Sequence, residues 1–150
     1  MSSRMNYAQP WQPYRQVSTQ TASPGQLVLM LYDGAIRFLE RAMLGFGYED
    51  PLEYNQTISN NLLRAQSIIH ELNNSLNLEA GGELASTLRR LYDYMDHRLM
   101  ESNIRKCPDG IKDTIRRLTI LRDAWQQMLE NRAGESGLAN RVASSLCVCG

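Results

Sequence analysis

Residues 51–76 read PLEYNQTISNNLLRAQSIIHELNNSL and hold the clearest periodic pattern in the chain. Their apolar side chains recur in steps of four and three residues, at Ile58, Leu62, Ala65, Ile69, Leu72 and Leu76. Because an α-helix turns once in about 3.6 residues, this spacing places them on one stripe. Asp50 precedes the segment as an N-cap, and Pro51 suits the first helical position. The stretch therefore predicts an amphipathic helix that packs this stripe against other helices.

Three further segments have helical periodicity, and each has a readable start. Ser23 opens the first as an N-cap, with Gln26 placed to complete a capping box. The predicted helices are residues 24–44, 82–104 and 111–132, the last following Cys107-Pro108-Asp109-Gly110. Connections of roughly six to eight residues favour antiparallel neighbours. The sequence thus predicts an all-α, antiparallel four-helix bundle over residues 23–132, with an N-terminal arm at 1–22 and a flexible C-terminal tail at 133–150.

Composition limits the classes of protein to consider. The chain has 150 residues, enough for one domain, and its 16 basic residues balance 16 acidic ones. That balance argues against a broad nucleic-acid-binding surface. The longest purely apolar run, residues 27–31, is far shorter than the ~20 residues that a membrane span needs. Three cysteines, Cys107, Cys147 and Cys149, fit a reducing compartment, so we expect a cytoplasmic protein.

The apolar stripes of the third and fourth helices predict the rest of the core. The third stripe is Leu84, Leu88, Leu91, Met95 and Leu99, with Tyr92 and Tyr94 on its edges. The fourth is Ile111, Ile115, Leu118, Trp125 and Leu129. Arg122 falls within the fourth stripe. Its long aliphatic stem can pack there while the guanidinium reaches water or an acidic partner.

The first helix has two apolar stripes on roughly opposite sides. One stripe is Leu27, Leu31, Gly34, Phe38 and Ala42, and the second is Leu29, Tyr32, Ile36, Leu39 and Met43. A peripheral bundle helix needs an apolar arc of little more than about 100°. We therefore expect something to cover the second stripe. The candidates are the aromatic N-terminal arm, a second copy of the chain, or a partner helix.

Residues that could support catalysis or bind a metal are few. His70 and His97 lie on different predicted helices, and neither has a ligand spacing. Asp93 and His97 are four residues apart, which fits a solvated surface pair better than a metal site. The chain has no phosphate-binding loop, dinucleotide fingerprint or nucleophile elbow. We expect no cofactor and no metal, and an enzyme is the weakest class.

Several blocks of sequence resemble the FliS family, the bacterial flagellar secretion chaperones. They are TASPGQL at 21–27, MLYDGA at 30–35, RAQSII at 64–69, LYDYM at 91–95 and LRDAW at 121–125. Each block alone is weak, but together they stand in the right order and on the right helices. The resemblance covers about residues 5–130.

The resemblance implies a non-catalytic helical bundle that binds the disordered C-terminal segment of flagellin in apolar surface grooves. It further implies that the chaperone prevents premature polymerisation and aids delivery to the flagellar type III export gate. In this family an N-terminal tyrosine can occupy part of the empty client site, and Tyr14 matches it best. The expected client contacts are Tyr14, Tyr32, Ile36, Leu39, Leu63, Tyr92 and Tyr94.

Two other readings of the residues stay open. The bundle could be a structural or regulatory homodimer that buries the second stripe of the first helix against its own copy. It could also be a metal-dependent bundle enzyme. The chaperone reading expects a monomer or a weak homodimer.

Overall fold

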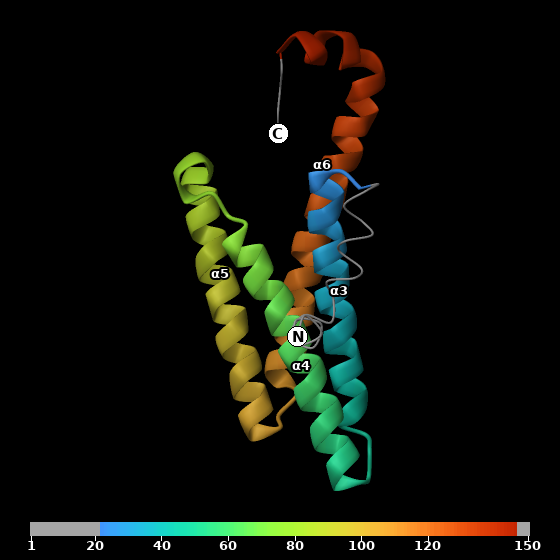
Figure 1. Cartoon of the computed structure of the whole chain (residues 1–150), viewed down its shortest axis with the longest axis vertical. Coiled ribbons are helices and arrows are strands. Elements are labelled where there is room, and N and C mark those ends of the chain that lie inside the picture. Colours follow the sequence, from blue (N-terminus) through green and yellow to red (C-terminus); the bar gives the residue numbers. More distant parts are fainter. Residues whose placement is uncertain (1–21, 147–150) are drawn as a thin grey trace, which may run out of the picture.

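A computed structural model describes residues 22–146 of the chain, and the side chains of residues 22–134. This part forms four helices and no strand. The helices are α3 (Pro24–Gly45), α4 (Pro51–Asn74), α5 (Leu78–Arg105) and α6 (Asp109–Leu146). They run alternately up and down, side by side (Figure 1). The predicted all-α bundle is confirmed.

The four helices form a closed ring in which each one packs against two neighbours: α3 against α4, α4 against α5, α5 against α6, and α6 against α3. The connecting residues are 46–50, 75–77 and 106–108, so the loops are shorter than expected. Loops this short place each helix antiparallel to the one before it and in contact with it.

The predicted starts of α3 and α4 are confirmed by their hydrogen bonds. The Gln26 backbone N–H donates to the Ser23 hydroxyl at 3.2 Å, and the Ser23 N–H donates to the Gln26 side chain at 3.1 Å. At α4 the Glu53 N–H donates to the Asp50 carboxylate at 2.9 Å. These bonds satisfy N–H groups that a helix start otherwise leaves unpaired.

α5 begins earlier than predicted. Asn77 caps it, with its side chain accepting from the Ala80 N–H at 3.0 Å. The helix is interrupted at Gly82, where φ is 56° and ψ is −131°. Glycine alone adopts this backbone conformation readily, because it has no Cβ. The sequence prediction therefore placed the start of α5 at an internal break.

The α4 stripe forms the centre of the core. All of its members except Leu76 are buried, and Leu76 is half-buried against the core. On α5, Met95 and Leu99 are fully buried, but Leu84 is 69% exposed. The predicted core role of Leu84 is wrong, because the α4–α5 hairpin diverges from α3 and α6 at that end (Figure 1).

The two stripes of α3 face two different neighbours. On the first stripe, Gly34 lies against the Ile68 side chain of α4. On the side of the second stripe, the Asp33 carboxylate accepts from Arg122 of α6 at 2.6 Å. Tyr32 and Leu39 of the second stripe are buried, with exposures of 4% and 0%. The expectation that this stripe needs a cover from outside the bundle is corrected, because α6 packs along it.

The last helix is longer than the sequence predicts. α6 was expected to end near Arg132 but continues to Leu146. The N-terminal arm, apart from its last residue, lies outside the described residues, so the division into arm, bundle and tail stays a prediction. Among the described helices, none combines the length and apolar content required to cross a lipid bilayer.

Candidate functional site

Three of the predicted client contacts lie inside the bundle. Tyr32, Leu39 and Tyr92 are each at most 4% exposed. The Tyr32 and Tyr92 hydroxyls share a hydrogen bond of 2.5 Å across the core. Burial raises the pKa of both phenols above the ordinary value of 10.0. In this conformation these side chains offer no surface to a partner.

The other predicted contacts differ in exposure. Ile36 is half-buried and packs against the core. Leu63 is 57% exposed and Tyr94 is 41% exposed. Tyr14 lies outside the described residues. The structure therefore presents Leu63 and Tyr94 to solvent, and it places them on opposite sides of α5.

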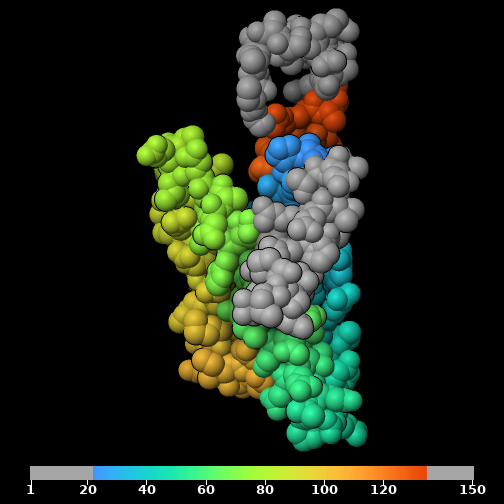
Figure 2. Space-filling model, viewed as in Figure 1, coloured from blue at the N-terminus to red at the C-terminus, as the bar shows by residue number. Residues whose placement is uncertain are grey.

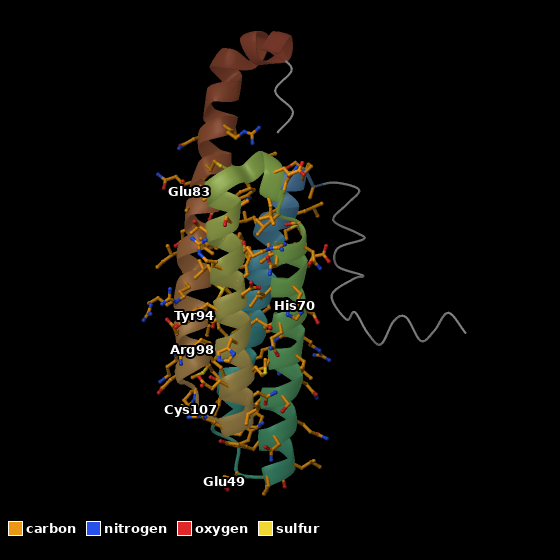
Figure 3. All side chains as sticks on the ribbon, turned by 90° about the vertical axis from the view of Figure 1, so that its left-hand side faces the viewer. Glu49, His70, Glu83, Tyr94, Arg98 and Cys107 are labelled. Carbon is orange, nitrogen blue, oxygen red and sulfur yellow. The ribbon has the colours of Figure 1, made fainter. Side chains whose placement is uncertain are left out.

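Leu63 belongs to the face formed by α4 and α5. Polar pairs join these helices on either side of it: Ser59 donates to Asn103 at 2.9 Å, and Gln66 donates to Asp96 at 2.9 Å. Because the helices are antiparallel, this register brings Leu63 level with Met100. We call the exposed side chains Leu63, Met100 and Ile104 the α4–α5 patch. Figure 3 labels His70, which lies on this side of α5 and contacts Asp96 at 3.0 Å.

Tyr94 belongs to the face formed by α5 and α6. Its hydroxyl donates to the Asp113 carboxylate at 2.8 Å, and the Arg117 guanidinium lies over its ring, 4.8 Å from the centroid. Figure 3 shows Tyr94 and Arg98 on the edge of α5 nearer to α6. Near the α5–α6 turn, where Tyr94 contacts α6, this face is polar.

Asp113 is the buried centre of this polar cluster. It pairs with Arg117 at 3.1 Å, with Arg98 at 3.5 Å and with Arg116. Desolvation alone would raise the pKa of Asp113. The hydrogen bonds from Tyr94 and Arg117, with the nearby positive charges, outweigh that effect and hold its pKa below the ordinary value. Arg116 and Arg117 lie three and four residues from Asp113 on the same helix, whereas Tyr94 and Arg98 come from α5.

Farther from the turn, the same face becomes apolar. On α5 the stripe toward α6 continues through Leu91 to Leu84. On α6 it continues through Ile120, Ala124 and Met128, which are all exposed. Figure 2 shows the opening where the α4–α5 hairpin diverges from α3 and α6. We call the two stripes together the α5–α6 face. It consists of Leu84, Leu91, Tyr94 and Arg98 on α5 and of Asp113, Arg117, Ile120, Ala124 and Met128 on α6.

Sequence reasoning missed most of this face, although one signal for it was present. The steps of three and four residues from Arg117 through Ile120 and Ala124 to Met128 mark a second stripe on α6. That stripe was not separated from the core stripe beside it. Arg98 lies 3.8 Å from Glu101 on its own helix, but its contact with Asp113 joins two helices, and no local spacing indicates it.

Arg122 behaves as the sequence predicts. Its guanidinium donates to the Asp33 carboxylate at 2.6 Å, which joins α6 to α3, and this bond raises the pKa of Arg122. The Trp125 ring N–H donates to the Gly25 carbonyl at 2.8 Å on the same seam. The α3–α6 seam is therefore tied by polar bonds and is not an open groove.

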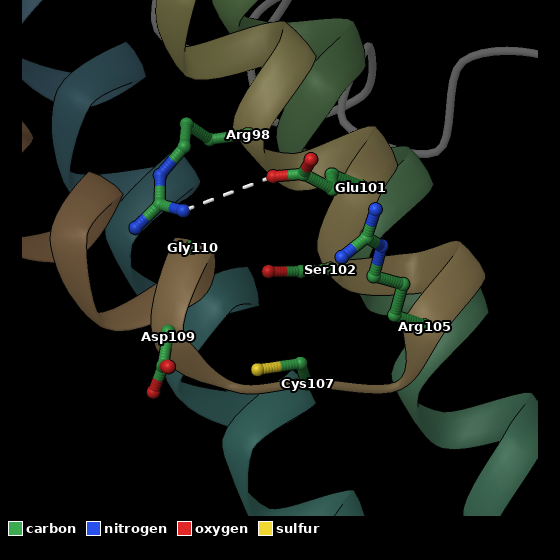
Figure 4. Close-up of a pocket in the computed structure, with 7 residues that line it drawn as sticks. All are labelled: Arg98, Glu101, Ser102, Arg105, Cys107, Asp109 and Gly110. Carbon is green, nitrogen blue, oxygen red and sulfur yellow. Dashed lines mark ion pairs between the residues drawn. The ribbon is translucent and has the colours of Figure 1, made fainter.

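A small pocket lies at the α5–α6 turn (Figure 4). Its volume is about 190 Å³, and its lining includes Arg98, Ser102, Arg105 and Cys107. This space is too small for a peptide segment, and its residues do not form a nucleophile–base pair. Among the described residues, no three His, Cys, Asp or Glu side chains gather in a way that could hold a metal ion.

Comparison with known proteins places these features in a family. The model of the family described as "Flagellar protein FliS" matches residues 7–132. The chain is 37% identical over 134 residues to the flagellar secretion chaperone FliS of Bacillus subtilis, covering 87% of this chain and 96% of that one. It is 38% identical over 120 residues to the FliS chaperone of Salmonella typhimurium, covering 77% and 86%. The Escherichia coli FliS chaperone is 33% identical over 130 residues, covering 83% and 93%.

Proposed function

The chain belongs to the FliS family, and we propose that it is an export chaperone that binds the disordered C-terminal segment of flagellin. By holding that segment it prevents flagellin from polymerising in the cytoplasm and delivers it to the flagellar type III export gate. It works by binding alone, without catalysis, cofactor or metal. The observation that carries this proposal is the family match across residues 7–132, which includes nearly the whole bundle.

The exposed apolar surfaces support a client that wraps around α5. The α4–α5 patch lies on one side of this helix, and the apolar part of the α5–α6 face lies on the other. A disordered segment that folds on binding gives up roughly 2–5 kcal/mol in ordering, so it needs a long apolar interface. Contacts on both sides of α5 would provide that length, with Leu63 in the α4–α5 patch and Tyr94 at the polar end of the α5–α6 face as the predicted contacts that solvent reaches.

The N-terminal arm would act as a lid on the client site. Tyr14 would occupy a share of the apolar surface when no client is bound, and the client would displace it. The proposal expects a monomer or a weak homodimer. The alternative is a non-catalytic helical dimer with a structural or regulatory role, whose mass would not change when flagellin is added.

Calorimetry of the full chain against the C-terminal segment of flagellin from the same cell tests this function. We expect one-to-one binding that Leu63→Glu and Tyr94→Glu each weaken by about tenfold or more. Leu44→Glu is the matched control, because Leu44 is 64% exposed on α3, away from both surfaces. Equal losses in all three variants would reject these two surfaces as the client site.

The same measurement on Tyr14→Ala tests the lid. Tighter binding identifies Tyr14 as a competitor of the client, and weaker binding identifies it as a client contact. Light scattering over a concentration series measures the mass of the protein and so distinguishes the dimer alternative from the chaperone proposal. A tight dimer that neither binds the segment nor changes mass with it would overturn the chaperone proposal.

A further inference from the structure

We propose that the α5–α6 face is a docking site for an amphipathic partner helix whose first turn carries carboxylates and whose later turns are apolar. The carboxylates would meet the basic end of the face, which we define as Arg98, Lys112, Arg116 and Arg117. The apolar turns would cover Ile120, Ala124 and Met128. This site takes a partner by charge as well as by apolar contact. Its apolar part overlaps the surface proposed for the flagellin segment, so a helix bound here would compete with that client, but its binding can be measured without flagellin.

The basic end has more positive charge than its own acids neutralise. The depression at this end has a volume of about 390 Å³ and is lined by the four basic residues together with Tyr94, Asp109 and Asp113. Four cations face these two carboxylates, and Arg98 also pairs with Glu101 at 3.8 Å, which leaves a local excess of one positive charge in a chain whose formal net charge is zero. A local excess of this kind favours an acidic partner.

Among the described residues, most guanidinium N–H groups in this cluster have no hydrogen-bond acceptor. A guanidinium has five N–H groups, and Arg116 and Arg117 each use one of them on Asp113. The buried Nε of Arg98 makes no hydrogen bond, although it lies 3.5 Å from an Asp113 oxygen. Incoming carboxylates would supply acceptors for the exposed N–H groups of Arg116 and Arg117, whose side chains are 68% and 38% exposed, whereas the Arg98 Nε is buried and out of reach. Such charge-assisted bonds are stronger than neutral ones.

One of these donors, Arg117, is also held in place before a partner arrives. The Arg117 side chain is fixed between the Tyr94 ring, at 4.8 Å, and the Asp113 carboxylate, at 3.1 Å. Side chains that are already ordered lose less conformational entropy on binding. Arg117 is therefore a preformed hydrogen-bond donor for an incoming carboxylate rather than a freely moving surface charge.

The change from basic to apolar along the face indicates the partner's direction. Acidic side chains are favoured in the first turn of a helix, where the backbone dipole is positive. A helix laid along α6 with its N-terminus at Arg116 would place its following apolar residues over Ile120 and Met128, which are 62% and 37% exposed. The distance from Asp113 to Met128 corresponds to about four helical turns. The basic end is too short to follow a nucleic-acid backbone, which favours a peptide helix.

Synthetic helices of about sixteen residues provide the probe. One carries Glu at its first-turn positions and a Leu stripe behind them, the second has Gln in place of Glu, and the third carries the Glu residues in its last turn. We expect the Glu-headed helix to bind the full-length protein about tenfold more tightly than the other two by fluorescence anisotropy. High salt should remove that advantage.

Lys112→Glu combined with Arg116→Glu should abolish the preference for the Glu-headed helix. Arg37→Glu combined with Arg41→Glu is the matched control, because it changes net charge equally on the outer side of α3 and should leave the preference intact. If circular dichroism shows that the first variant is unfolded, Arg116→Gln replaces it, with a smaller loss in the same direction.

Three outcomes would overturn the proposal: no binding of any helix, equal binding of the Glu-headed and Gln-headed helices, or an unchanged preference in the charge-reversed protein. Light scattering of the protein alone adds a fourth. Self-association that the Lys112 and Arg116 reversals abolish would assign the face to a second copy of the chain instead.

Discussion

The Tyr32 hydroxyl on α3 lies 2.5 Å from the Tyr92 hydroxyl on α5, and both side chains are at most 4% exposed. α3 and α5 are not neighbours in the ring of helices, so this hydrogen bond crosses the middle of the bundle. A buried hydroxyl needs a partner, because water cannot reach it. Each tyrosine therefore supplies the hydrogen-bond partner that allows the hydroxyl of the other to be buried.

Removing one of the two hydroxyls should cost more than removing both. Tyr32→Phe or Tyr92→Phe leaves the other hydroxyl buried without a partner, which we expect to lower the free energy of unfolding by about 1–3 kcal/mol. The double variant has no unpaired hydroxyl and should lose less than the sum of the single variants. Urea unfolding of the four proteins gives the coupling energy. Additive losses would mean that the two hydroxyls do not depend on each other.

The same pair predicts a loss of stability in alkali. Burial raises the pKa of Tyr32 and Tyr92 above 10.0, so above that pH the unfolded chain releases phenolic protons that the folded chain retains. The free energy of unfolding then falls as the pH rises, by up to about 1.4 kcal/mol per pH unit for each tyrosine. Urea unfolding between about pH 9 and about pH 11 measures this slope. The double Phe variant should have a distinctly shallower slope, and an equal slope would refute the assignment.

Local sequence rules predicted the helices well, because they depend on neighbours in the chain. The Ser23–Gln26 capping box and the α4 stripe require only residues three or four positions away. The break at Gly82 shows where these rules fail. Gly82 resembles a helix start, yet Asn77 caps the helix earlier.

The surface was harder to predict, because it depends on which helices meet. Periodicity found both stripes of α3 but could not say that α6 would cover the second one. It grouped Tyr92 and Tyr94 as edges of one stripe, although Tyr92 is 2% exposed and Tyr94 is 41% exposed. The cluster around Asp113 joins residues of two helices, and no local pattern contains it.

Leu84 and Leu99 belong to the same sequence stripe but should respond differently to truncation. Leu99 is fully buried, and Leu99→Ala should lower the free energy of unfolding by about 2–5 kcal/mol. Leu84 is 69% exposed, so Leu84→Ala should change it by about 0.5 kcal/mol or less. Urea unfolding of the two variants measures both values. A large loss for Leu84→Ala would mean that the end of the α4–α5 hairpin is packed in solution.

Two glycines of α6 should respond in opposite directions to a methyl group. A Cβ at Gly110 would lie 2.6 Å from the Arg98 carbonyl oxygen, a backbone atom that cannot easily move away. Gly110→Ala should therefore lower the melting temperature, at a cost of about 1–3 kcal/mol. Gly134 has open space around its Cβ position, so Gly134→Ala should stabilise the helix by up to about 1 kcal/mol. Thermal unfolding followed by circular dichroism compares them, and a neutral Gly110→Ala would show that α5 and α6 can separate there.

Asp113 should make the bundle sensitive to acid. Its pKa lies below the ordinary value of 3.8, so the unfolded chain takes up a proton at a higher pH than the folded chain does. The contribution of Asp113 is therefore complete above about pH 5 and is lost as the pH falls through the folded-state pKa. Asp113→Asn should reduce stability at neutral pH by about 1–3 kcal/mol and should flatten the acid limb of the stability curve. Asp123→Asn is the control, because the Asp123 side chain is 64% exposed and its loss should leave that limb unchanged. Urea unfolding from about pH 6 to about pH 3 measures the free energy of unfolding of both variants. If the two variants depend on pH in the same way, the three arginines and Tyr94 do not stabilise a buried charge on Asp113.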